Sequence, residues 1–311
     1  MNAVQISLMG SLSDTSGRSP VDAVVDDVAQ WHQEGFRRVW LTQRPPEPDL
    51  LTVLAVVLRE VDSVEVGSAV IPIQNQHPML LAQRALTLSM IGKGRFILGL
   101  GLTQRLVTWD MWGIPWDKPL RRLGECLDCL QPLLAGETAD AVGEIVTTRG
   151  SLQIPGAPAP DVYVAALGPQ MLRLAGQRTA GTVTWMTGPT TLAEYVVPTL
   201  RAAAVAAGRP ENAVRVVAAL PVSVTDDVAA ARATAAEVFG RYAQQQNYRD
   251  MFAREGIAGP ADLAFIGDEH AVTERIQGLS DAGVDELIGV VFESSRQGQD
   301  RTRALLRQLD T

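Results

Sequence analysis

The sequence predicts an α/β protein, a (β/α)8 TIM barrel with an insertion after strand 4. Eight short apolar runs of strand length alternate with segments of helical periodicity along the 311 residues. Two of these runs, residues 64–71 and 96–100, are about as apolar on both faces, which is typical of parallel strands covered on both sides. No repeat, low-complexity tract or linker interrupts the chain. We therefore expect a single domain over residues 1–311.

The clearest β-α-β unit extends from Glu65 to Gly101. Residues 64–71 and 96–100 are the two apolar runs, and a helix begins between them at Pro78, a residue suited to a first helical turn. Its apolar stripe consists of Leu81, Ala82, Ala85 and Leu88. The second strand ends in Gly99-Leu100-Gly101, where missing side chains would let a planar ligand or a phosphate approach the backbone.

The other elements of the first half follow from the same patterns. Strands are expected over residues 4–9 and 36–41, and helices from Ser19-Pro20 and over 49–61. Residues 102–160 are too many for one barrel connection and predict the insertion. Within it we expect a helix over 120–134, ended by Gly136, and a hairpin over 144–154.

The second half repeats the alternation. A strand from Val162 leads through a glycine turn to a helix start at Pro169. Further strands are expected over residues 182–187, 214–224 and 286–292. Further helices are expected over 190–207, over 226–248 with Asp226 or Thr225 as its cap, from Asp268 to Gly283, and over 300–309.

Composition excludes several classes of protein. The net charge is −8 and no basic tract is present, which argues against a nucleic-acid partner. No apolar run approaches the roughly 18 residues of a membrane span, and no secretory signal precedes the first strand. We expect a cytoplasmic protein that contacts neither membrane nor nucleic acid.

Side chains that carry chemistry are few. No Ser-His-Asp order, zinc-protease motif or Walker sequence occurs, and three scattered histidines predict no metal site. Cys126 and Cys129 form a C-x-x-C within a helical stretch without a second pair, which favours two small buried thiols. No catalytic residue can be named. This scarcity indicates a protein that binds, orients and shields a cofactor.

The order G-S-A-V, H-P, L-A, an alanine-rich helix and G-K-G-R-F-I-L-G-L-G resembles the core of the luciferase-like flavin and deazaflavin oxidoreductases. In particular it is similar to the branch that uses coenzyme F420, over nearly the whole chain. The resemblance implies hydride transfer between F420 and a small organic substrate, in a homodimer. Two alternatives stay open: an FMN-dependent monooxygenase, and a non-catalytic flavin-binding protein.

The resemblance also implies where the cofactor binds. A cis peptide between Ala69 and Val70 would back its central ring, and the helix start at Gly168–Met171 would hold its phosphate, as exposed N–H groups at a helix N-terminus can. The strand end at Trp185–Thr187 would contact it as well. The implied cofactor-binding residues are Gln43, Ser68, Ala69, Val70, Gly101, Thr103, Gly168, Pro169, Gln170, Met171, Trp185, Met186 and Thr187.

One position departs from the family. Where related deazaflavin enzymes often carry an Asp-His pair for proton transfer, this chain has Gln43 and Arg44. A glutamine can hydrogen-bond a ring but cannot act as a general base at neutral pH. Arg44 would either hold an anionic substrate or face solvent in its loop.

Three further residues are candidates for substrate binding. His77 precedes the helix start at Pro78, where it would cap the helix or contact the substrate. Trp109 and Trp112 belong to an aromatic-rich stretch after the Gly101 strand end. That stretch would pack the insertion, form a pocket wall for an apolar substrate, or make a subunit contact.

Overall fold

The computed structural model describes residues 4–13 and 17–310. It confirms the predicted barrel: strand pairing forms a closed ring of eight strands. The ring runs through β10 (Arg215–Val224), β12 (Glu286–Val291), β1 (Gln5–Gly10), β2 (Arg38–Leu41), β3 (Glu65–Ser68), β5 (Phe96–Gly101), β8 (Val162–Val164) and β9 (Gly181–Trp185), which pairs with β10 again.

The chain divides into two compact units, which we describe separately. The unit called N here comprises residues 10–32 and 39–165, and the unit called C comprises the chain up to residue 9, residues 33–38 and residues 166–311. Among the helices that the structure describes, none combines the length and the apolar character needed to cross a bilayer.

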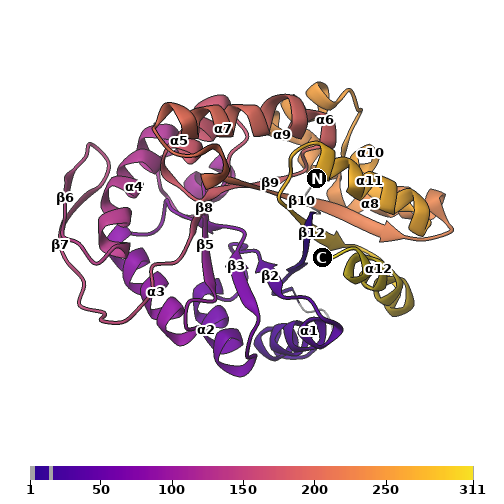
Figure 1. Ribbon diagram of the computed structural model, residues 1–311, viewed down its shortest axis with the longest axis horizontal. Helices are drawn as coiled ribbons and strands as arrows, with labels where there is room; N and C mark the ends of the chain where they lie inside the picture. The colour runs from indigo at the N-terminus through magenta and orange to yellow at the C-terminus, as the bar shows by residue number, and fades with distance from the viewer. Residues whose placement is uncertain (1–3, 14–16, 311) are drawn as a thin grey trace. The chain divides into compact units, whose positions relative to one another are not determined.

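Unit N contains the β-α-β unit that the sequence predicts. The helices are α1 (Pro20–Glu34), α2 (Leu50–Glu60), α3 (Pro78–Ile91) and α4 (Pro119–Leu134), and a short strand β4 (Ile71–Pro72) also pairs with β5. All six residues of β5 are buried, as a strand covered on both faces requires. Asp49 caps α2 by accepting a hydrogen bond from the backbone N–H of Thr52 at 2.9 Å. In Figure 1, α2, α3 and α4 follow one another along the outside of β3 and β5.

The insertion in unit N has a π-helix, η1 (Leu106–Met111), and an antiparallel hairpin of β6 (Ala139–Val142) and β7 (Thr147–Gly150). The hairpin expected over 144–154 is therefore wrong in position. The reason lies in α4, whose Glu125 carboxylate accepts the N–H groups of Glu144, Ile145 and Val146 at 3.0, 2.7 and 3.0 Å. Because the Glu125 side chain, from outside the hairpin, binds these N–H groups, residues 143–146 form the turn of the hairpin. Figure 1 shows the hairpin beyond α4.

Unit C holds the remaining helices. They are α5 (Pro169–Arg178), α6 (Pro189–Thr191), the π-helix η2 (Leu192–Val196), α7 (Val197–Ala206), the 3-10 helix η3 (Glu211–Ala213), α8 (Val228–Phe239), the 3-10 helix η4 (Gly240–Gln244), α9 (Gln246–Glu255), α10 (Pro260–Leu263), α11 (Glu269–Asp281) and α12 (Arg296–Leu309). The short strand β11 (Phe265–Gly267) pairs with β10 and was not expected.

Two helix predictions in unit C are wrong. The helix expected over 226–248 breaks at Gly240, and its cap is Asp227, whose carboxylate accepts the N–H of Ala230 at 3.0 Å. An alanine-rich pattern has no signal for this break, because the packing of Phe239 and Tyr242 against Trp185 holds the turn. The last helix begins at Arg296, before the expected residue 300, because Ser295 caps it.

The strand starts of unit C enclose a buried ion pair. The fully buried Glu286 carboxylate pairs with Arg38 at 2.5 Å and accepts the hydroxyl of Ser7 at 2.8 Å. Arg215 approaches the same carboxylate at 3.8 Å. Burying a charge without partners costs free energy. These contacts therefore indicate that Glu286 has a structural role at the strand starts of unit C.

Candidate cofactor site

In unit N, the end of β3 lies tightly against β5. The Ser68 hydroxyl donates to the carbonyl of Gly99 and accepts its N–H, both at 2.9 Å. The peptide bond between Ala69 and Val70 is cis, as predicted. Ser68 is fully buried, while Ala69 and Val70 are half-buried. The side chains after β3 therefore reach the surface where the ring contact is predicted.

The glycines of β5 make this approach possible. A Cβ on Gly99 would lie 1.9 Å from the carbonyl oxygen of Ser68, and one on Gly101 would lie 2.5 Å from a methyl of Val70. The space beside both glycines is thus filled by the end of β3. These glycines therefore let β3 place Ala69 and Val70, and the predicted contact of Gly101 with the cofactor stays a prediction.

The segment after β5 is fixed by one side chain. Gln74 donates from Nε2 to the carbonyl of Thr103 and accepts its N–H with Oε1, both at 3.2 Å. Its side chain is largely buried, so both hydrogen bonds are shielded from water. Thr103 is thereby held by Gln74, and its contact with the cofactor stays a prediction.

Gln43 is engaged within its own loop. Its Oε1 accepts the N–H of Leu50 at 2.7 Å, at the start of α2, and its Nε2 donates to the carbonyls of Arg44 at 3.0 Å and Pro48 at 3.5 Å. Arg44 forms an ion pair with Glu47. Both residues therefore shape the loop after β2, and their contacts to cofactor and substrate stay predictions.

His77 caps α3. Its Nδ1 accepts the N–H of Met79 at 3.2 Å, and its Nε2 lies 3.2 Å from the carbonyl of Thr147. The carbonyl can only accept, so Nε2 carries the proton. The capping interpretation is confirmed. Because both ring nitrogens are engaged, the predicted substrate contact would use the ring face or replace one of these bonds.

The aromatic-rich stretch of the insertion faces outward. Leu106, Trp109 and Met111 are 65%, 53% and 58% exposed, and Thr108 is the buried residue of η1. Trp112 is half-buried. Packing of the insertion therefore does not account for Trp109, and the pocket wall and the subunit contact remain as its predicted roles.

In unit C, the predicted phosphate site is an open helix start. Gly168 is the N-cap of α5 and makes no side-chain capping hydrogen bond, and a Cβ on Gly168 would meet nothing within 4 Å. Residues 168–170 are exposed. The N–H groups of Gln170 and Met171 lie in this uncapped first turn, where the helix dipole favours an anion.

The start of α6, the helix after β9, differs from the start of α5 because a side chain binds its N–H groups. The Glu255 carboxylate of α9 accepts the N–H groups of Thr190 and Thr191 at 3.1 and 2.7 Å, and the hydroxyl of Thr191 at 2.7 Å. A Cβ on Gly188 would lie 2.2 Å from the Glu255 carboxyl carbon. A carboxylate of this chain already occupies the α6 start, so α5 is the better anion site of the two.

The strand end at Trp185–Thr187 is packed within the unit. Trp185 contacts the rings of Phe239 and Tyr242 edge to face, at centroid distances of 5.8 and 5.6 Å. Met186 is fully buried at a φ of +53°, a conformation that side chains rarely adopt. The Thr187 hydroxyl donates to the carbonyl of Trp185 at 3.3 Å. The predicted cofactor contacts of these three residues stay predictions.

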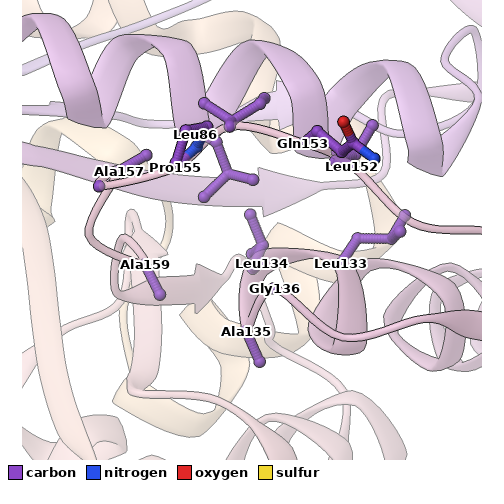
Figure 2. A pocket seen from close by; sticks show the side chains of 12 residues that line it. Leu86, Leu133, Leu134, Ala135, Gly136, Leu152, Gln153, Pro155, Ala157 and Ala159 are labelled. Atoms are coloured by element: carbon purple, nitrogen blue, oxygen red, sulfur yellow. The ribbon is translucent and has the colours of Figure 1, made fainter.

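A cavity of about 810 Å³ lies elsewhere in unit N. Figure 2 shows Leu86 of α3, Leu133 and Leu134 of α4 and the segment 152–159 around it. Its lining contains no titratable side chain and none of the predicted site residues. It is therefore a gap between helices on the flank of the unit and offers no group for catalysis.

The thiols of the C-x-x-C are buried, as predicted, and form no disulfide. Burial, and to a smaller degree the neighbouring Cys129, raises the pKa of Cys126 to about 12. At pH 8 roughly one molecule in ten thousand carries this thiolate. We expect the native protein not to react with a thiol reagent such as dithionitrobenzoate, whereas both cysteines react in denaturant. Rapid reaction of the native protein would contradict this burial.

Within residues 4–13 and 17–310, no group of three histidine, cysteine, aspartate or glutamate side chains is arranged to hold a metal ion. Unit N has a half-buried surface after β3, and unit C has an open helix start. That either of them binds a cofactor stays a prediction.

The model of the luciferase-like monooxygenase family matches residues 4–286, and the chain belongs to this family. The resemblance stated from the sequence is thus confirmed.

Relatives with assigned activities use different cofactors. The chain is 31% identical over 235 residues to 5,10-methylenetetrahydromethanopterin reductase of Methanolobus tindarius, covering 76% of this chain and 71% of the relative. The coenzyme F420-dependent tetrahydromethanopterin reductase of Methanopyrus kandleri has the same fold, with a TM-score of 0.80, 20% identity and coverage of 99% and 98%. An oxygenating component of the Pseudomonas putida 3,6-diketocamphane monooxygenase, in complex with FMN, has a TM-score of 0.79 at 18% identity, with coverage of 99% and 98%.

Proposed function

We propose that this protein is a coenzyme F420-dependent oxidoreductase that transfers hydride between the deazaflavin and a small organic substrate. The tetrahydromethanopterin reductases among its relatives support F420. The observation that carries the proposal is the uncapped first turn of α5, which suits a phosphate without help from a basic side chain.

The chain's own residues would bind and orient the cofactor. Gly168–Met171 would hold the phosphate with backbone N–H groups. Ala69 and Val70 would support the ring, with Ser68 and Gly99 keeping this surface in place. When bound, the deazaflavin supplies a ring carbon that accepts or donates hydride. Because the Gln43 amide cannot take up a proton at neutral pH, the proposed reaction uses no general base at that position.

The second candidate is an FMN-dependent monooxygenase. The structure of the 3,6-diketocamphane monooxygenase component in complex with FMN favours it, and the α5 start suits the FMN phosphate equally well. Cofactor identity therefore has to be decided by binding.

A fluorescence titration of the protein with F420 and with FMN tests the proposal. We expect submicromolar binding of F420 and at least roughly tenfold weaker binding of FMN, a difference of about 1.4 kcal/mol. The reverse order would support the monooxygenase. Binding without turnover over a broad substrate panel would favour a non-catalytic flavin-binding protein, and no binding of either cofactor would remove the proposal.

We further propose that the chain works as a cytoplasmic homodimer on a small-molecule substrate, as the sequence resemblance implies. The exposed side chains of Trp109 and Met111 in η1 support a role in the substrate or subunit surface. Light scattering coupled to gel filtration would report the oligomeric state directly.

A further inference from the structure

Tyr195, which no sequence motif singles out, contacts the residue before the open helix start. Its hydroxyl donates a hydrogen bond to the carbonyl of Leu167 at 3.0 Å. The peptide unit that contains this carbonyl also contains the N–H of Gly168. Because the peptide is planar and trans, fixing the direction of the Leu167 carbonyl fixes the direction of the Gly168 N–H on the opposite side. A hydrogen bond to the carbonyl also polarises that N–H and makes it a stronger donor.

The last turn of α9 holds Tyr195 in place. The Arg254 guanidinium lies over the Tyr195 ring, 4.1 Å from its centroid. The next residue, Glu255, binds the N–H groups of Thr190 and Thr191 at the start of the same helical segment. Two adjacent side chains of α9 thus hold the α6–η2 segment at two points, and Tyr195 lies in η2, a π-helix, an element often found at functional sites.

Tyr195 is suited to donate at neutral pH. Burial raises the pKa of its phenol, an effect that Arg254 and Arg173 partly offset and that Asp250 adds to. The phenol therefore keeps its proton. The Leu167 carbonyl can only accept, so the Tyr195 hydroxyl is the donor of this hydrogen bond.

From these contacts we infer that Tyr195 is a positioning residue for the anion-binding start of α5, held by Arg254 and acting on bound phosphate through the Leu167–Gly168 peptide. The inference rests on the proposed phosphate site and adds the residue that orients it. Tyr195 does not touch the phosphate itself. It therefore changes how strongly the phosphate is bound and leaves the binding of the ring unaltered.

The test compares two ligands, the deazaflavin riboside and its phosphate monoester, which differ only in the phosphate. In the wild type the monoester binds more tightly than the riboside. In Tyr195→Phe we expect the ratio of the two affinities to fall roughly 3- to 10-fold, the worth of one hydrogen bond, with the riboside affinity unchanged. Arg254→Gln should lower the same ratio. Tyr248 is another half-buried tyrosine of unit C, and Tyr248→Phe should leave the ratio as in the wild type.

The possible outcomes distinguish the inference about Tyr195 from the proposed phosphate site. If Tyr195→Phe weakens the binding of both ligands equally, Tyr195 has a merely structural role. If it leaves both affinities and their ratio unchanged, Tyr195 has no role. Either result overturns the inference while the phosphate site stands. If the wild type binds riboside and monoester equally, the phosphate site itself is wrong and the inference fails with it. A lower ratio in Tyr195→Phe but not in Arg254→Gln supports Tyr195 and overturns the part assigned to α9.

Discussion

Replacing Gly168 with aspartate is expected to abolish tight cofactor binding while leaving the fold at least as stable. Gly168 has a φ of −76° and a ψ of 152°, and open space surrounds its missing Cβ, so a side chain fits there without strain. An aspartate at this N-cap would accept the free N–H groups of the first turn and place a negative charge where the phosphate binds. We expect a gain of about 0.5 kcal/mol in unfolding free energy and a loss of at least roughly 100-fold in F420 affinity, since two hydrogen bonds to a charged group are lost.

The opposite signs of the two effects make this substitution informative. Denaturant unfolding measures the first and fluorescence titration the second. Gln245→Asp is the matched control, because Gln245 is the N-cap of α9 and has an extended backbone. It places an aspartate at another helix start of unit C and should leave cofactor affinity unchanged. Wild-type affinity in Gly168→Asp would exclude the α5 start as the phosphate site.

The sequence was sufficient for the barrel because its signals are local. Asp49 before α2, Pro78 in the first turn of α3 and the all-apolar β5 each report an element from within a few residues. The cis bond between Ala69 and Val70 was also predicted, from resemblance to a family.

What the sequence could not predict depends on side chains far apart along the chain. Glu125 fixes a hairpin turn about 20 residues away, Glu255 fills a helix start 64 residues before it, and Tyr195 reaches Leu167 across 28 residues. The residues next to a glutamate or tyrosine in a helix do not indicate that it has such a distant partner. For the same reason, the two glycine-proline helix starts at α5 and α6 look alike in sequence, and the position of Glu255 alone distinguishes them.

Replacing Gly99 with alanine is expected to cost at least about 3 kcal/mol of unfolding free energy, toward the upper end for overpacked cores. The new Cβ would lie 1.9 Å from the backbone carbonyl oxygen of Ser68, so β3 or β5 would have to move. At Gly101 the nearest atom is a methyl of Val70 at 2.5 Å, which can give way more easily. Gly101→Ala should therefore cost less than Gly99→Ala.

Denaturant unfolding of both variants gives the comparison, with Gly278→Ala as control. Gly278 lies in the interior of α11 with open space around its missing Cβ, so alanine there should stabilise by about 0.5–1 kcal/mol. Movement of β3 would also displace the half-buried side chains of Ala69 and Val70, so Gly99→Ala should bind F420 more weakly even where it remains folded. If its stability and affinity match the wild type, the close approach of Ser68 to β5 is not what holds the proposed ring-binding surface in place.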